Sequence, residues 1–448
     1  MTDFLLISNA RIVNDGRTVE GDVLVRNGRI EQVAGGIRAP ARARVLDAAG
    51  RWLLPGMIDD QVHFREPGLT HKGDIATESA AAVAGGVTSF MDMPNVLPQT
   101  TTREALAAKY ALAAGRARAN YAFYLGATNR NLDEIRALEV GEACGIKVFM
   151  GASTGDMLVD DAGTLERLFA GAPLLVVTHC EHSPTIRENE ARARERFGED
   201  VPMTEHPAIR SAEACYRSSA TAVGLAQRHG ARLHILHLTT AAEMELLSPG
   251  PRREKRVTGE VCVHHLWFDE SRYPELGTRI KCNPAIKSAA DREALLAAVN
   301  DGRLDVIATD HAPHTAEEKA ESYFRAPAGL PLVQHVLVAL LDLVRAGALS
   351  VETVVERTSH AVADIYGVAD RGYVREGYHA DLVLVDPERP QPVHRDNLLY
   401  KCGWSPFEGH TFSASIDTTI VNGRIAWQDG RLTDEIAGQR LAFTRGRD

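Results

Sequence analysis

The chain has 448 residues, of which 44% are hydrophobic and 25% charged, and its 50 basic and 60 acidic residues give a net charge of −10. These ordinary globular values exclude long disorder, and an acidic chain without a basic block argues against nucleic acid or a membrane as partner. No run of 18 uncharged apolar residues occurs, and Asp3 stands where a signal peptide would be basic. Six scattered cysteines without a C-x-x-C pair suit reduced thiols, so we expect a cytoplasmic protein.

Both ends of the chain have the pattern of short β-strands. Apolar, β-rich runs separated by Asn-Gly turns occupy residues 4–34 and 380–432, and the tetrapeptide NGRI occurs at 27–30 and again at 422–425. Neither end shows a sustained helical period. We therefore expect a composite small β-domain, a β-sandwich formed by residues 1–54 and 375–448, with residues 55–374 inserted as a second domain.

The middle of the chain alternates between apolar runs and helix-like stretches. The eight apolar runs are Trp52–Ile58, Val87–Met93, Tyr121–Leu125, Ile146–Met150, Leu174–His179, Leu233–Leu238, Val257–Val263 and Leu304–Thr309. Eight strands alternating with helices predict an α/β fold, a (β/α)₈ TIM barrel over residues 55–374. A doubly wound open sheet is the alternative, because periodicity alone does not separate the two. The absence of G-x-G-x-x-G after the first run excludes the usual dinucleotide site.

Polar residues gather where these runs end. Catalytic groups of a barrel come from the carboxyl ends of its strands, so side chains at these positions converge on one mouth. Neutral imidazoles with a carboxylate suit Zn²⁺ or a similar divalent ion. The residues are Gln61, His63 and Arg65 after the first run, Asn95 after the second, Lys147 in the fourth, His179, His237 and Glu260 in the fifth to seventh, and Asp310 and His314 after the eighth.

Lys147 is the unusual member of this group. It lies inside an apolar strand, where an uncompensated ammonium is costly, and a dication would repel it. A lysine whose amine has added CO₂ becomes an anionic carbamate with two oxygens, which can bridge two metal ions. Two dications with Asp310, the carbamate and a bridging hydroxide then leave one positive charge, which suits the activation of water and of a carbonyl.

Several motifs in order resemble one known family across nearly the whole chain. They are VHFREPG with THK at residues 62–72, GGVTSFMDMPN at 85–95, GIKVFMGAS from Gly145, EVCVHHL at 260–266, ATDHAPH at 308–314 and REGYHADLVLVD at 375–386. These motifs are similar to those of the amidohydrolase superfamily, and within it to dihydroorotases of the long bacterial type.

The resemblance implies a role for each residue. It implies metal ligation by His63, Lys147, His179, His237 and Asp310, with one or two zinc ions per chain and a carbamylated Lys147 as the bridge. Asp310 would be the general acid and base, and Arg65, Asn95 and His314 would bind the substrate carboxylate. The implied reaction is the reversible cyclisation of N-carbamoyl-L-aspartate to L-dihydroorotate in pyrimidine biosynthesis, by metal-bound hydroxide chemistry. A homodimer is what the resemblance suggests as assembly, and the roles of Glu260 and Asn283 stay open.

One position departs from the family pattern. The family usually has H-x-H at the first strand, and Gln61 stands where the first histidine would be. An amide oxygen is a weaker zinc ligand than an imidazole. In order of expectation, Gln61 ligates weakly and activity persists, the first metal site is weak or empty, or catalysis is lost.

Two other functions remain open. Another cyclic amidase (a dihydropyrimidinase, hydantoinase or allantoinase) shares the metal set but acts on substrates without the carboxylate. A non-catalytic dihydroorotase-like partner of aspartate transcarbamoylase would share the fold but usually lack several ligands.

Overall fold

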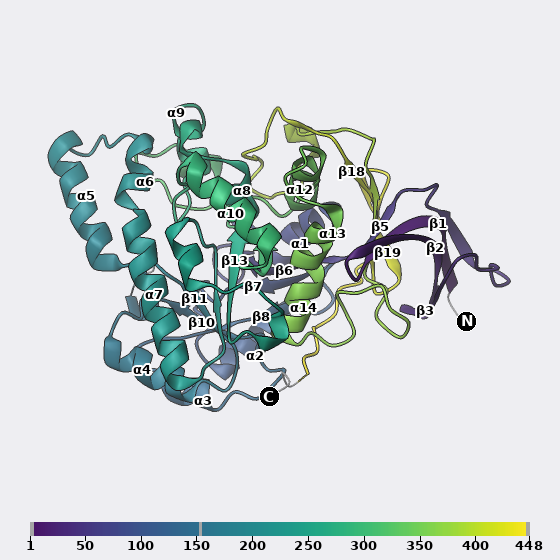
Figure 1. Ribbon diagram of the computed structural model, residues 1–448, viewed down its shortest axis with the longest axis horizontal. Coiled ribbons are helices and arrows are strands. Elements are labelled where there is room, and N and C mark those ends of the chain that lie inside the picture. Colours follow the sequence, from purple (N-terminus) through teal and green to yellow (C-terminus); the bar gives the residue numbers. More distant parts are fainter. Residues whose placement is uncertain (1–3, 152–154, 445–448) are drawn as a thin grey trace.

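Eight strand positions run parallel and close into a barrel in the computed structural model, which describes residues 4–151 and 155–444 (Figure 1). A parallel bridge between Val62 and His311 joins the last strand to the first, so the sheet has no open edge there. The predicted TIM barrel is confirmed, and the open-sheet alternative is wrong. The strands are β6 (Met57–Val62), β7 (Val87–Asp92), β8 (Asn120–Phe123) continued by β9 (Leu125–Gly126), β10 (Ile146–Phe149), β11 (Val176–His179), β12 (Leu233–Ile235), β13 (Val257–Cys262) and β14 (Val306–Ala308).

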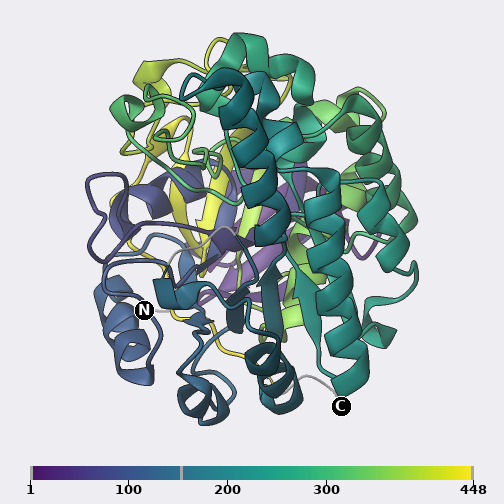
Figure 2. The same cartoon turned by 90° about the vertical axis from the view of Figure 1, so that its left-hand side faces the viewer.

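Helices cover the outside of the barrel. Seen from the side away from the small β-domain, they stand in front of the strands (Figure 2). Among the described residues, no helix is long and apolar enough to cross a bilayer. The longer helices are α1 (Ile75–Ala84), α2 (Arg103–Ala113), α4 (Ala162–Gly171), α5 (Ser183–Phe197), α7 (Ala212–His229), α10 (Ala289–Asp301) and α12 (Val336–Arg345). The shorter ones are α3 (Leu132–Arg136), α6 (His206–Ile209), α8 (Val263–Trp267), α9 (Tyr273–Leu276), α11 (Ala316–Lys319), α13 (Val351–Val355) and α14 (Ala361–Tyr366).

A second, nine-stranded sheet draws its strands from both ends of the chain. Its order is β20-β19-β18-β15-β5-β1-β2-β3, with β4 beside β1, and it lies to the right of the barrel in Figure 1. The exact domain boundaries stay a prediction, and residues 1–3 and 445–448 of the predicted domain lie outside the described residues. The strands are β1 (Phe4–Asn14), β2 (Arg17–Arg26), β3 (Arg29–Ala34), β4 (Arg44–Asp47), β5 (Trp52–Pro55), β15 (Leu382–Asp386), β18 (Ser415–Val421), β19 (Arg424–Gln428) and β20 (Arg431–Leu432).

The two NGRI segments meet in space. Asn27-Gly28 and Asn422-Gly423 both turn with positive φ angles, as the tight turns of β-hairpins require. A Cβ added to Gly28 would lie 2.7 Å from the backbone oxygen of Asn422, and one added to Gly423 would lie 2.6 Å from the Cα of Gly28. The repeat therefore marks two hairpin turns that pack against each other at the junction of the chain's ends.

The first predicted strand needs a correction. The run Trp52–Ile58 is not one strand: β5 pairs with β1 and β15 in the nine-stranded sheet, and β6 begins the barrel after Gly56. A Cβ at Gly56 would lie 2.1 Å from the Thr88 hydroxyl oxygen, so only glycine allows the chain to pass from one sheet to the other here. The sequence did not predict this break between two strands, because both segments are buried and the apolar run continues through them.

A buried polar network joins the two sheets. Asp381, directly before β15, forms an ion pair with Arg371, and both side chains are 3% exposed. Its carboxylate also accepts hydrogen bonds from the Asn120 side chain at 3.1 Å and from the Asn422 backbone at 2.7 Å. One carboxylate thus holds a barrel strand, a hairpin turn and the connecting segment together.

Replacing Asp381 with Ala should lower the free energy of unfolding by about 3–5 kcal/mol, because the Arg371 charge would stay buried without its partner. Urea denaturation followed by circular dichroism measures this change. The control is Glu31→Gln, which breaks an exposed pair with Arg26 and should cost less than about 1 kcal/mol. Equal effects of the two changes would contradict this role for Asp381.

Candidate active site

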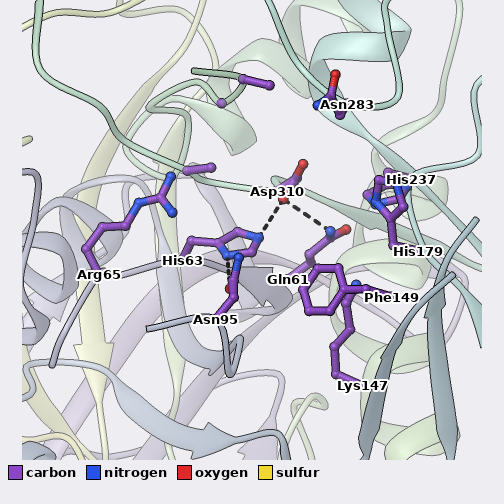
Figure 3. Close-up of a pocket in the computed structure, with 13 residues that line it drawn as sticks. Gln61, His63, Arg65, Asn95, Lys147, Phe149, His179, His237, Asn283 and Asp310 are labelled. Atoms are coloured by element: carbon purple, nitrogen blue, oxygen red, sulfur yellow. Dashed lines mark hydrogen bonds and ion pairs between the residues drawn. The ribbon is translucent and has the colours of Figure 1, made fainter. Parts of the chain in front are cut away.

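A pocket opens at the carboxyl ends of the barrel strands (Figure 3). Its volume of about 100 Å³ suits a small molecule. Seven of the eight residues predicted for the site line it, and the eighth, His314, lies behind Arg65. The seven are His63, Arg65, Asn95, Lys147, His179, His237 and Asp310.

On one side of the pocket, Asp310 is held by two donors. The His63 Nε2 lies 3.1 Å from Asp310 Oδ1, and the Gln61 Nε2 donates to the same oxygen at 3.1 Å (Figure 3). The His63 Nδ1 lies 2.8 Å from the Asn95 side-chain oxygen, which orients the ring. Burial alone would raise the pKa of Asp310, but the hydrogen bond and charge of His63 keep it below its usual value. Asp310 is therefore an ionised carboxylate at neutral pH.

On the opposite side, two histidines face each other. The His179 Nδ1 and the His237 Nε2 are 2.9 Å apart, and the two rings meet edge to face. The His179 Nε2 contacts Glu181 at 2.8 Å, and Arg210 donates to the same carboxylate oxygen at 2.7 Å. Burial lowers the pKa values of both histidines, so both rings are neutral at pH 7. Glu181 therefore accepts the Nε2 proton of His179, which leaves the Nδ1 lone pair directed into the pocket.

Lys147 reaches the pocket from β10. Its side chain is 1% exposed, and its ammonium lies 4.6 Å from the centre of the Phe149 ring, two residues further along the same strand. No carboxylate of the described residues lies within ion-pair distance of its Nζ. Burial lowers the pKa of Lys147 to about 8, so at neutral pH a minor fraction of the amine is uncharged, far more than for an ordinary lysine. A buried, unpaired amine is the state that reacts with CO₂.

Arg65 is a buried cation that forms no ion pair with a carboxylate in the described part of the chain. It is 7% exposed, donates from Nε to the Pro313 backbone oxygen at 3.0 Å, and lies with Nη2 2.9 Å from the His314 Nε2. No carboxylate of the described part of the chain is paired with it, since the neighbouring Glu66 pairs with Arg116 at 2.8 Å. A structural ion pair of Arg65 with Glu66 or Asp60 would be the alternative to a substrate-binding role, and the described residues contain neither pair.

His314 lies between two cations. Its Nδ1 is 3.0 Å from the Lys72 Nζ, while its Nε2 faces Arg65. Burial and these two charges hold the pKa of His314 well below its usual value. The neutral ring contacts the Arg65 guanidinium, so direct contact with a substrate stays a prediction for His314.

Three pocket residues have left-handed backbone conformations. The φ angles are 69° at Arg65, 38° at His237 and 49° at Asp310. Such angles cost roughly 1–2 kcal/mol for a residue with a Cβ, and they gather at functional sites where the backbone redirects a side chain. Each lies just past the end of a barrel strand, where it turns the side chain from the strand direction toward the pocket.

The donor set fits a divalent metal centre. Three imidazoles and one carboxylate line the same pocket, and the buried His237 Nδ1 has no hydrogen-bond partner among the described residues. The His179 Nδ1 and the His237 Nε2 lie 2.9 Å apart, so one nitrogen from each ring lies at the same place in the pocket. This is the ligand chemistry of zinc and related ions.

Several lining residues come from outside the predicted set. Gln61 and Asn283 line the pocket, and the strand that carries Lys147 adds Phe149, which the period of two along a strand would have indicated. Ala312, Ala328 and Gly329 complete the wall from the segment after β14. A Cβ on Gly329 would lie 2.4 Å from the Ala312 backbone oxygen, so the wall is formed by close backbone approach, which leaves no motif in the sequence.

Comparison with known proteins gives consistent results. The model of the amidohydrolase family matches residues 52–426. A dihydroorotase of Halobacterium salinarum is 35% identical over 437 residues, which cover 94% of this chain and 98% of that protein. A dihydroorotase of Bacillus cereus is 33% identical over 430 residues, which cover 94% and 98%.

A solved structure has the same fold. The L-hydantoinase (dihydropyrimidinase) from Arthrobacter aurescens superimposes with a TM-score of 0.92 at 26% identity, covering 99% of this chain and 100% of that one. The match extends over nearly all of both chains, so it includes the barrel and the second sheet of this protein. The chain therefore belongs to the amidohydrolase family.

Proposed function

We propose that this chain is a dihydroorotase, a metal-dependent hydrolase that interconverts L-dihydroorotate and N-carbamoyl-L-aspartate. Similarity to dihydroorotases over nearly the whole chain supports this reaction. The observation that carries the choice of substrate is Arg65, a buried guanidinium on the pocket wall without a carboxylate partner in the described residues. Burying an unpaired cation is costly unless an anion arrives with the ligand. A substrate carboxylate satisfies Arg65, whereas the neutral rings of hydantoins and dihydropyrimidines leave it unpaired.

The substrate would lie between Arg65 and the histidine pair. The planar guanidinium offers two parallel N–H donors to a carboxylate, and His314 holds it through the 2.9 Å contact at Nη2. Asn95 lines the same wall and can donate its amide N–H, because its oxygen faces His63. These contacts orient the ring so that its amide bond faces Asp310.

The metal ligands would be divided between the two sides of the pocket. His63 and Asp310 would hold one ion, His179 and His237 the other, and a carbamylated Lys147 would bridge them, with zinc as the metal we expect. Bound there, the ions would supply Lewis-acid chemistry, polarising the amide carbonyl and activating water. The burial of Lys147 and the lack of an ion pair with any carboxylate of the described residues support the carbamate, because the modification replaces a costly buried cation by a ligand.

Asp310 would move the proton. Both of its contacts, from His63 and Gln61, are to Oδ1, so Oδ2 is the oxygen that takes up a proton from water. The same oxygen would return the proton to the ring nitrogen as the amide bond breaks. In the direction of ring closure the two transfers reverse.

Turnover of L-dihydroorotate, followed at its ring absorbance beside hydantoin and dihydrouracil, tests the proposal. Metal analysis of the same preparation accompanies it. We expect turnover of dihydroorotate to exceed that of the neutral rings by at least 100-fold, with metal bound. Faster turnover of a neutral ring would assign the chain to the hydantoinase or dihydropyrimidinase activity instead. Two other results would also contradict the proposal. One is bound metal without any turnover, and the other is the absence of both metal and turnover in a preparation that contains a co-purifying transcarbamoylase.

Gln61 gives a separate prediction about the first metal position. As the structure places it, the amide donates to Asp310, while its Oε1 lies 3.7 Å from the Cys262 Sγ. Gln61→His should raise retention of the first ion by about 10–100-fold, because imidazole is the stronger ligand. Metal content after dialysis against a graded series of chelator concentrations measures this. Gln61→Leu, which removes the donor without adding a ligand, is the control, and equal retention by both variants would contradict a ligand role at this position.

We also propose that the protein works in the cytoplasm. All six cysteines are free, and five are buried, which supports a reducing environment. A homodimer stays a prediction.

A further inference from the structure

A second group of metal-ligating side chains lies beneath the floor of the pocket. Asp60 on β6, His234 on β12 and Glu260 on β13 are each 0% exposed. The His234 Nε2 lies 3.3 Å from Asp60 Oδ2 and 3.7 Å from Glu260 Oε2. One ligand atom from each of the three residues lies within 4.8 Å of the others. Neither Asp60 nor His234 lines the pocket, so this cluster is separate from the site described above.

The cluster is short of hydrogen bonds. Both oxygens of Asp60, the His234 Nε2 and Glu260 Oε2 have no hydrogen-bond partner in the described structure, although all are buried. The adjacent Asp59, by contrast, has the hydrogen bonds that a buried carboxylate usually has. Its buried carboxylate accepts hydrogen bonds from the Thr309 hydroxyl, the Thr309 backbone and the Gln61 backbone. Buried polar atoms in native proteins are nearly always satisfied, so unsatisfied atoms on three residues whose ligand atoms lie within 4.8 Å of one another indicate a missing partner.

The orientation of His234 narrows what that partner is. The Thr258 hydroxyl donates to the Leu233 backbone oxygen at 3.3 Å, so it accepts the Nδ1 proton of His234 at 2.8 Å. Against the effect of burial, the Asp60 and Glu260 carboxylates raise the pKa of His234 to about 9, so in the metal-free chain the other ring nitrogen, Nε2, carries a proton between them. A bound dication would displace that proton and take the Nε2 lone pair. Lone pairs from three side chains converge, and a positive charge between them removes the repulsion.

The spacing matches a metal ion. Ligand atoms about 2.0–2.2 Å from a tetrahedral ion lie about 3.3–3.6 Å from one another. The observed separations of 3.3 and 3.7 Å from His234 Nε2 are close to this range. Two carboxylates also balance the charge of a dication when the imidazole is neutral. We propose that Asp60, His234 and Glu260 bind a third divalent ion, of the zinc or manganese class, inside the barrel below the catalytic pocket.

This ion would act as a positioning element. The other oxygen of Glu260, Oε1, accepts the backbone N–H of His237 at 3.0 Å, and Asp60 directly precedes Gln61. Cross-linking three strands at this level would fix the backbone of His237, whose φ angle of 38° is strained. The Cys262 Sγ lies 3.5 Å from Glu260 Oε1 and 3.7 Å from the pocket residue Gln61, so a single layer of side chains separates the two sites.

Anomalous diffraction from crystals of the full-length protein tests the proposal directly. Data collected at the zinc and manganese edges should show a peak enclosed by Asp60, His234 and Glu260, apart from any peak at His179 and His237. Pocket peaks without a peak at the buried cluster would overturn the proposal and indicate that a proton on His234 balances the charge. A crystal of the unaltered chain gives this answer without depending on the folding of a variant.

Metal analysis of matched variants provides the second test. Asp60→Asn and Glu260→Gln keep the side-chain shape but weaken ligation, and each should lose about one ion per chain relative to the unaltered protein. The control is Asp59→Asn, a buried neighbour that already has its hydrogen bonds and should keep the full metal content. Equal metal content in all four proteins would overturn the proposal. Because the test measures ions and not turnover, its result is independent of the substrate proposed above.

Discussion

Replacing Asp310 with Asn should lower kcat for L-dihydroorotate by about 10³-fold, within the usual range of about 10²–10⁴ for a general acid–base group. Asn keeps an oxygen toward His63 and Gln61, so the side chain retains its shape and contacts. It cannot take up and return a proton, and this loss affects ring opening and ring closure alike. Steady-state kinetics in both directions, with metal analysis of the same sample, measure the effect.

The matched control for this variant lies at the other end of the same region. Asp305, just before β14, is also buried, but it pairs with Lys255 at 2.7 Å and accepts the Gly259 backbone N–H at 3.1 Å. Residues at this end of a barrel serve stability, so Asp305→Asn should lower the melting temperature and leave kcat of the folded protein unchanged. A kcat for Asp310→Asn within tenfold of the unaltered enzyme, at equal metal content, would contradict the role of Asp310.

Much of the pocket could be predicted because, in a barrel of parallel strands, the carboxyl ends of all strands lie around the same opening. Each strand end contributes to one mouth, so residues as distant in sequence as His63 and His237 were expected at the same pocket. The apolar run around Lys147 also indicated that its side chain is buried. The strand order needed no contact information, because the connections between parallel strands are regular.

Other features could not be predicted, since they depend on which way a side chain turns. His314 and Arg65 are both near strand ends, but only the structure places His314 behind the guanidinium. Asp59 and Asp60 are neighbours with the same chemistry, yet one is hydrogen-bonded and the other is not. The left-handed backbone angles at Arg65, His237 and Asp310 likewise turn side chains toward the pocket, and apolar periodicity contains no information about them.

The chain around Gly56 shows that sequence patterns can also miss a feature of the fold. An unbroken apolar run predicts one strand, whereas the chain leaves one sheet and enters another within it. Burial on both sides removes the alternation that would mark the passage. The dipeptide Pro55-Gly56 is the local sign of the break, and the need for glycine depends on the Thr88 side chain that occupies the space beside it.

Replacing Arg65 with Met should separate the two kinds of substrate. We expect kcat/KM for L-dihydroorotate to fall by about 10²–10³-fold, since removing one partner of a buried, hydrogen-bonded charge pair costs about 3–4 kcal/mol. Any turnover of hydantoin or dihydrouracil should change less than about fivefold, because these rings have no carboxylate to bind. Arg65→Lys should recover only part of the loss, since an ammonium lacks the planar pair of donors.

The melting temperature of the unliganded protein is an independent test of the role of Arg65. Because Arg65 has no carboxylate partner among the described residues, Arg65→Met should leave the melting temperature unchanged or raise it, whereas loss of a structural ion pair would lower it. Arg116→Met is the control: it removes the partner of Glu66 outside the pocket, so it should lower stability and alter turnover of all substrates equally. Equal losses of dihydroorotate and hydantoin turnover in Arg65→Met would contradict carboxylate binding by Arg65. A selective loss together with unchanged stability would mean that the energetic cost of burying this cation is recovered only when the substrate binds.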